Sequence, residues 1–157
     1  MKAIRFLAAI VPLAAAALAG CTHETPQLSM NPGYRLGYDD KGASVALVYG
    51  LPNSDDLALM LECPKGSGRV ELTDAVRDKQ AKTVTLTADG RGTTVPVKIE
   101  TGVDDYVVTG RLGLSAPALQ GFRRSGVMQV ANGRARYVIK VDAKGRAGVE
   151  RFFEVCG

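Results

Sequence analysis

Short segments of alternating apolar residues, separated by turn formers, dominate this chain and restrict the folds open to it. They occur at 34–38, 43–49, 57–63, 69–73, 82–87 and 93–100. In one of them Leu57, Leu59, Leu61 and Cys63 recur at every second position, the period that places side chains on one face of a β-strand. Gly, Pro, Asn and Asp fill the short connections, as expected for tight turns. The pattern predicts antiparallel strands.

The clearest hairpin signal is Asn132-Gly133, a dipeptide that favours a two-residue turn. We expect it to join strands at 126–131 and 134–141. In the second strand every other residue is apolar, whereas Arg134, Arg136 and Lys140 fall on the opposite face. This arm therefore predicts a core face and an exposed basic face.

One stretch departs from the strand pattern. In residues 115–125, Ser115 can cap a helix, Pro117 fits a first turn, and Gly126 can end it. We expect one short helix there and a last strand at 149–156. Pro96 cannot donate a ladder hydrogen bond, so its strand should be an edge or carry a bulge. The expected fold is mostly β, an antiparallel meander forming a β-sandwich or small barrel with one short helix.

The N-terminus has the features of a targeting segment. Lys2 and Arg5 precede the apolar run 6–19, whose 14 residues are fewer than the roughly 20 needed for a membrane-spanning helix. A cleaved signal is therefore favoured over a permanent span. The sequence Leu18-Ala19-Gly20-Cys21 follows, and it resembles the lipobox of bacterial lipoproteins. The alternative is an ordinary signal peptide cut near a cysteine.

The lipoprotein resemblance implies that residues 1–20 are removed and that Cys21 carries lipid, including palmitate-type acyl chains. Two or more chains anchor a protein stably. Residues 21–33 would then be the lipidated N-terminus and tether, and residues 34–157 a single β-rich domain. In this family an Asp after the modified cysteine retains the protein in the inner membrane. Thr22 stands there, which favours the periplasmic face of the outer membrane.

Lipidation of Cys21 would leave two cysteines, Cys63 and Cys156. In an oxidising periplasm such a pair predicts a disulfide, and two buried free thiols are the alternative. The ending Phe152-Phe153-Glu154-Val155-Cys156 is similar to that of small envelope proteins of the invasion-associated locus B type. These proteins also combine a short helix with a late strand that ends in Cys. The resemblance covers the last third of the domain and implies no function.

Charge is distributed unevenly. Residues 21–110 hold nine Lys and Arg against thirteen Asp and Glu, and residues 111–157 hold nine against three. A secreted, anchored chain does not meet nucleic acid, so the basic part points to an acidic envelope polymer or an envelope protein as partner. The alternative is a solvated basic face with no partner.

Candidate chemistry is limited by the single histidine, His23, which lies in the expected tether. The domain therefore has no imidazole for Ser-His-Asp or Cys-His catalysis or for a His-based metal site, and we expect no cofactor. Two acidic pairs remain, Asp55-Asp56 and Asp104-Asp105. Carboxylate pairs can serve glycoside hydrolysis, but turn formation explains them as well.

The segment 49–56 is the candidate recognition loop. It combines Tyr49, Asn53, Asp55 and Asp56 around a Pro-Asn turn, although an ordinary strand connection could have the same composition. The leading hypothesis is a non-catalytic, lipid-anchored binding or structural domain. The second is an inhibitor of a periplasmic hydrolase such as lysozyme, with the acidic loop meeting a basic cleft. An envelope glycan enzyme using acidic residues ranks last.

Overall fold

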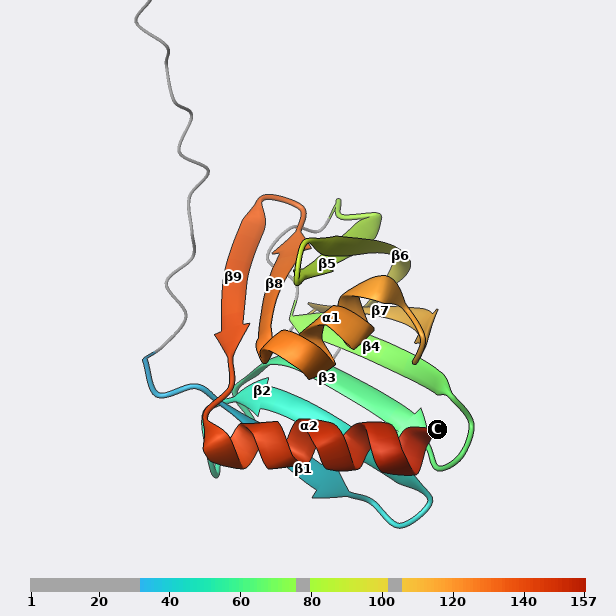
Figure 1. Ribbon diagram of the computed structural model, residues 1–157. Coiled ribbons are helices and arrows are strands. Elements are labelled where there is room, and N and C mark those ends of the chain that lie inside the picture. The colour runs from blue at the N-terminus through green and yellow to red at the C-terminus, as the bar shows by residue number, and fades with distance from the viewer. Residues whose placement is uncertain (1–31, 76–79, 102–105) are drawn as a thin grey trace, which may run out of the picture.

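The computed structural model describes residues 32–75, 80–101 and 106–157 of the 157-residue chain (Figure 1). The fold is mostly β, with nine strands and two helices in this part of the chain. The strands are β1 Arg35–Asp40, β2 Ser44–Gly50, β3 Leu57–Pro64, β4 Arg69–Ala75, β5 Thr83–Ala88, β6 Arg91–Thr101, β7 Tyr106–Gly113, β8 Val127–Asn132 and β9 Ala135–Lys140. The helices are α1 Pro117–Ser125 and α2 Ala143–Cys156.

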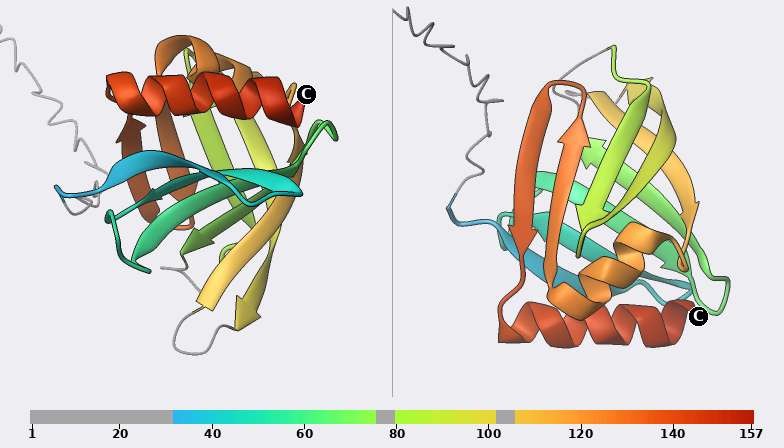
Figure 2. Two further views of the ribbon diagram at one scale, coloured as in Figure 1. Left: turned by 90° about the horizontal axis from the view of Figure 1, so that it is seen from below. Right: turned by 45° about the horizontal axis from the view of Figure 1, so that its top comes forward.

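All neighbouring strands are antiparallel and form one sheet that is nearly closed into a barrel. The order is β1-β2-β3-β4-β7-β6-β5-β8-β9, so it follows the chain from β1 to β4 and then departs from it. The strands curve around a shared interior, and both helices lie at the same end of the barrel (Figure 2). The predicted class is confirmed, a mostly β antiparallel fold with a short helix at about 115–125.

The barrel interior is filled by side chains. Inward positions of the strands supply large fully buried residues such as Leu47, Leu61, Leu72 and Leu86, and the helices add Phe122 and Phe152. Strands β4, β5 and β9 alternate strictly between this core and the exterior, whereas β2 buries Val45, Ala46 and Leu47 in succession. Side chains from the strands and from both helices thus share one packed core.

The prediction of a last strand at 149–156 is wrong, because this segment belongs to α2. The Asp142 side chain caps the helix by accepting a hydrogen bond from the Gly145 N–H at 2.8 Å. Val149, Phe152, Phe153 and Cys156 are buried, and their spacing of three and four residues is that of one helix face. The sequence contained both signals, but the run of β-prone residues hid them.

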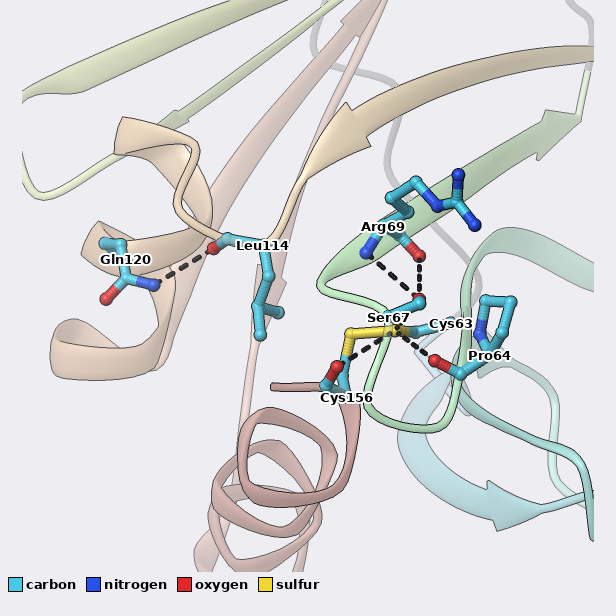
Figure 3. Close-up of a disulfide and its surroundings, with 7 residues drawn as sticks. All are labelled: Cys63, Pro64, Ser67, Arg69, Leu114, Gln120 and Cys156. Carbon is cyan, nitrogen blue, oxygen red and sulfur yellow. Dashed lines mark hydrogen bonds between the residues drawn. A yellow bond between two sulfur atoms is a disulfide. The ribbon is translucent and has the colours of Figure 1, made fainter.

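The disulfide between Cys63 and Cys156 is present, with a Cα–Cα distance of 5.7 Å. It joins the end of β3 to the last turn of α2, not to a final strand as predicted (Figure 3). Beside it, the turn after β3 donates backbone hydrogen bonds from Gly66 to the Val155 carbonyl at 2.9 Å and from Gly68 to the Cys156 carbonyl at 2.8 Å. The turn thus satisfies carbonyls that the helix end leaves open.

Two local predictions need correction, and a third is confirmed. The two-residue turn of the last hairpin is Gly133-Arg134, because Asn132 pairs with Ala135, and Gly133 adopts a φ of 57°. Ser115 does not cap α1, since the cap residue is Ala116, without a side-chain hydrogen bond. Gly126 does end the helix, with a φ of 68° and its N–H bonded to the Phe122 carbonyl.

Strand β7 falls in a segment for which the sequence pattern gave no strand, and it pairs with both β4 and β6. Strand β6, which contains Pro96, is therefore an interior strand and not an edge. Its pairing with β5 covers residues 91–96, and its pairing with β7 begins at Val97. Pro96 stands where the pairing passes from one neighbour to the other, so its missing N–H breaks no ladder toward β7.

Neither described helix is long and apolar enough to cross a membrane.

Candidate functional site

Of the predicted recognition loop 49–56, the first two residues end β2, and residues 51–56 form the loop between β2 and β3. This loop begins at an irregular point of the sheet. The register of β2 against β3 shifts between Tyr49 and Gly50. A Cβ on Gly50 would lie 2.5 Å from the Asp56 carbonyl oxygen, so only glycine allows the two ends of the loop to approach this closely. The Leu51 N–H bonds that carbonyl at 2.8 Å and closes the loop.

Side chains hold the rest of the loop in one conformation. The Tyr34 hydroxyl donates to the Asp56 carboxylate at 2.5 Å, and the Asp56 N–H donates to the Ser54 hydroxyl at 2.9 Å. Asn53 adopts a left-handed φ of 60°, which asparagine tolerates better than most residues. Pro52, Asn53, Ser54 and Asp55 are exposed. The loop therefore presents an ordered tip with one unshielded carboxylate, Asp55.

A groove of about 400 Å³ runs beside this loop. Its other walls come from the start of β1 and the start of α2. Two cations, Arg35 and Lys144, and two carboxylates, Asp56 and Asp142, line it. Such a mixed rim suits polar contacts with a protein surface rather than enclosure of an apolar ligand.

Tyr49 does not belong to the exposed loop, and its prediction as a contact residue is corrected. It is 7% exposed, with its ring edge-on to Tyr34 at 5.7 Å and stacked on Tyr137 at 6.3 Å. Burial raises the pKa of its phenol, while the charge of Arg35 opposes this effect. Tyr49 fixes the loop's base, because it connects the end of β2 to β9 through the core.

A buried polar cluster lies inside the barrel next to this tyrosine stack. Asp74 of β4 is 1% exposed and accepts hydrogen bonds from the Tyr137 hydroxyl at 2.6 Å and the Asn132 amide at 2.8 Å. The Asn132 Oδ1 atom is buried and has no hydrogen-bond partner among the described residues. The three residues join β4 to the β8–β9 hairpin by charge-assisted bonds.

Sequence reasoning missed the Asp74 cluster. The predicted strand stopped at Thr73, although the alternation of Val70 and Leu72 places Asp74 at the next inward position. Asn132 was assigned to a turn, yet it ends β8 with its side chain inside. A carboxylate at an inward position of an alternating strand was the signal that could have revealed the cluster.

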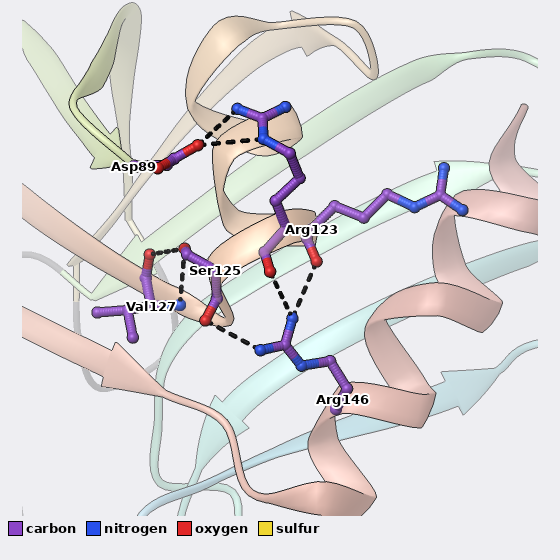
Figure 4. A network of polar contacts seen from close by, with 6 residues as sticks. Asp89, Arg123, Ser125, Val127 and Arg146 are labelled. Atoms are coloured by element: carbon purple, nitrogen blue, oxygen red, sulfur yellow. Dashed lines mark hydrogen bonds and ion pairs between the residues drawn. The ribbon is translucent and has the colours of Figure 1, made fainter.

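The structure divides the nine Lys and Arg residues of the basic C-terminal part into two groups. Arg111, Arg123, Arg124 and Arg151 form ion pairs with carboxylates. Arg146 of α2 donates to the carbonyls of Arg123, Arg124 and Ser125 at 2.9–3.1 Å and so covers the end of α1 (Figure 4). Five of these nine basic residues therefore make contacts within the domain.

The other group is Arg134, Arg136, Lys140 and Lys144. No hydrogen bond or ion pair between described residues involves their side chains, and all four are exposed. Three of them are the predicted basic face of the last hairpin. This face and the acidic loop 51–56 are connected only indirectly, through the stack of Tyr49 on Tyr137.

Several predicted features lie outside the described residues, namely the lipobox with Cys21, His23 and the pair Asp104-Asp105. Of the other acidic pair, Asp55 is free at the loop tip and Asp56 is bound to Tyr34. Among the described residues, no group of three or more His, Cys, Asp or Glu side chains could hold a metal ion.

Comparison of the chain with protein-family models, with characterised proteins and with solved structures gives no match.

Proposed function

We propose that this protein is a lipid-anchored envelope lipoprotein whose barrel is a non-catalytic binding domain, with residues 51–56 as its recognition element. One observation carries the proposal: the loop tip is exposed while its base is held by Tyr34, Ser54 and the Leu51–Asp56 backbone bond. A loop ordered before binding loses little conformational freedom when a partner docks. The filled barrel core supports contact at the surface.

The anchor and the loop fit together geometrically under this proposal. Tyr34, the residue before β1, is bonded to Asp56, so the proposed tether 21–33 joins the barrel beside the recognition loop. A tether of this length spans at most about 45 Å when extended. The partner would then be an envelope protein close to the membrane, at the periplasmic face of the outer membrane.

Metabolic labelling with a palmitate analogue tests the anchor. We expect the wild-type chain to take up label and Cys21→Ser to take up none. Equal labelling of the two chains, or no label in the wild type, would contradict lipidation at Cys21. The β domain's binding role is tested separately.

Photo-cross-linking in intact cells tests the recognition loop. Replacing Pro52 with p-benzoylphenylalanine places a reactive group at the exposed tip, at a residue that takes part in none of the bonds that hold the loop and has no left-handed φ. We expect a discrete cross-linked adduct from this position and none from the same replacement at Lys98, an exposed residue of β6. Adducts that are absent from position 52, or equal at both positions, would refute a specific partner at the loop.

A second candidate function, inhibition of a periplasmic hydrolase such as lysozyme, is favoured by the free Asp55 carboxylate at the loop tip. An acidic protrusion complements the basic cleft of such an enzyme. We expect inhibition of a lysozyme panel by the wild-type chain and its loss in Asp55→Lys, whereas Asp39→Lys, an exposed charge on β1, should inhibit normally. Failure of the wild-type protein to inhibit at micromolar concentration would exclude this function. The cross-linking experiment would still test whether the loop binds another partner.

A further inference from the structure

The two edge strands of the sheet, β1 and β9, differ in what packs against them. Helix α2 packs along β1 through two glycines. A Cβ on Gly145 would lie 3.4 Å from the Leu36 carbonyl oxygen, and one on Gly148 would lie 3.0 Å from the Tyr38 Cβ. Among the strands that the structure describes, β9 pairs with β8 only. It forms the free margin of the sheet in Figure 1 and in the right-hand view of Figure 2.

The register shows which backbone groups of β9 face this margin. Asn132 and Ala135 flank the two-residue turn, so they form a hydrogen-bonded pair. The Val141 N–H continues the same series with a bond to the Gly126 carbonyl at 3.0 Å. Odd-numbered residues of β9 therefore bond to β8. The N–H and C=O groups of Arg136, Val138 and Lys140 point away from it.

The same three residues place their side chains on the outer face, because Ala135, Tyr137 and Ile139 occupy the inner one. Arg136 and Lys140 are exposed and unpaired among the described residues, with the half-buried Val138 between them. Cations on an edge strand can act against unwanted pairing between like edges. They also attract a strand with carboxylates at the opposite positions, since cross-strand neighbours of opposite charge stabilise each other.

Other protective devices are missing from β9. It contains no proline, its register with β8 has no shift, and it is regular over all six residues. We infer that the free edge of β9 receives an extended acidic segment of a partner protein, which adds to the sheet by strand addition. Main-chain bonds to residues 136, 138 and 140 hold the segment, and Arg136 and Lys140 select acidic residues at alternating positions. This surface is separate from the recognition loop, so its test does not depend on the proposed function.

Amide hydrogen exchange of the purified full-length chain tests the pairing. The probe is a peptide in which glutamate alternates with threonine over about six residues, the length of β9. We expect exchange at the amides of Arg136, Val138 and Lys140 to slow by about tenfold or more with saturating peptide. A peptide of the same length with a central proline should give no protection. Unchanged exchange at these amides with millimolar probe would overturn the inference.

Two variants separate main-chain pairing from simple charge attraction, with affinity measured by fluorescence anisotropy of the labelled peptide. Val138→Pro removes an N–H at the free edge, a place where proline is compatible with the sheet, and should weaken binding by about tenfold or more. Arg136→Glu/Lys140→Glu should lose the glutamate peptide and bind one in which lysine alternates with threonine. Arg111→Glu, on the interior strand β7, should bind as the wild type does.

Two results would contradict strand addition. One is equal affinity of wild type and Val138→Pro. The other is binding of polyglutamate or an anionic polysaccharide to the same residues without amide protection, which would identify the hairpin as a polyanion surface.

Discussion

At the scale of single residues, two tyrosines illustrate opposite states of a buried hydroxyl. The Tyr137 hydroxyl donates to buried Asp74 at 2.6 Å, whereas the Tyr38 hydroxyl is buried and finds no hydrogen-bond partner in the described part of the chain. A bond to a carboxylate stabilises the folded state, but a buried hydroxyl with no partner costs desolvation free energy that nothing recovers. The same chemical change at these two positions should therefore have different effects.

We predict that Tyr137→Phe lowers the free energy of unfolding by about 1–3 kcal/mol, because it leaves a buried carboxylate oxygen without this donor. Tyr38→Phe should be neutral or stabilising. Urea unfolding followed by circular dichroism measures both. A loss in Tyr38→Phe as large as that in Tyr137→Phe would show that ring packing, not hydrogen bonding, dominates at these sites.

Glu62 provides a pH-dependent contribution. Hydrogen bonds from Lys41 at 2.8 Å and Ser44 at 2.6 Å lower the pKa of its carboxyl below the ordinary 4.5. The unfolded chain therefore takes up this proton at a higher pH than the folded chain does. The stabilisation is fully present above pH 4.5 and is lost as the pH falls through the lowered folded pKa.

We predict that Glu62→Gln is less stable than wild type at pH 7 by up to about 1 kcal/mol, since the ion pair is partly exposed. The difference should vanish in acid, below the folded pKa of Glu62. Glu71→Gln, which removes a 3.5 Å pair with an 88% exposed Arg111, serves as the control and should change stability little. A difference for Glu62→Gln that persists unchanged in acid would mean that the charge of Glu62 does not contribute.

At the scale of elements, the contact between α1 and α2 depends on one guanidinium group. Arg146 donates to three carbonyls at the end of α1. A Cβ on Gly126 would lie 2.6 Å from the Arg146 guanidinium, so glycine at this position lets the group lie close to the helix end. Arg123 adds an ion pair with Glu150 at 2.8 Å and lies over the Phe153 ring at 5.1 Å. These contacts hold α2 against α1 at one end of the barrel.

We predict that Arg146→Ala lowers the free energy of unfolding by about 1–3 kcal/mol, because three carbonyls lose a charged donor. Arg151→Ala, on the same helix, removes an exposed pair with Glu154 at 3.4 Å and a minor electrostatic interaction with exposed Asp40, and should cost less than about 0.5 kcal/mol. Thermal and urea unfolding of the two variants measure the contrast. Equal effects would mean that Arg146 acts only through general charge.

At the scale of the whole molecule, the disulfide fixes helix α2 in place at one margin of the incompletely closed sheet. It fixes the end of α2 to the end of β3, across a sequence separation of 93 residues, while α2 covers β1 at the margin of the sheet. Closing so long a loop restricts the unfolded chain by about 4–5 kcal/mol in the chain-entropy estimate. Helix α2, fixed by the disulfide, covers the edge strand β1, which in a complete barrel would pair with a further strand.

We predict that Cys63→Ser/Cys156→Ser lowers the free energy of unfolding by about 2–5 kcal/mol. A reducing agent should destabilise the wild-type chain to a similar extent and leave the variant unchanged. Removing the disulfide should also speed hydrogen exchange more at the amides of α2 than at those of β3 and β4. A variant as stable as the oxidised wild type would show that packing alone holds α2 in place.

The sequence by itself determined the strands whose alternation is regular, the single-turn connections, the short helix at 115–125 and the pairing of Cys63 with Cys156. These features depend on local period and on cysteine number. It did not reveal β7, whose residues carry no clear alternation, and it misassigned residues 149–156, where β-prone side chains obscured a helical spacing.

Only the tertiary structure decided which polar residues meet inside the barrel and which cations are free. The alternation of Val70 and Leu72 marks Asp74 as an inward residue, but only the sheet brings it beside Asn132. Arg146 and Arg136 are alike in sequence, yet one covers a helix end and the other lies on an open edge. Such distinctions depend on contacts between residues far apart in the chain, which no local pattern contains. The tyrosine stack, the held loop and the free margin of β9 are all of this kind.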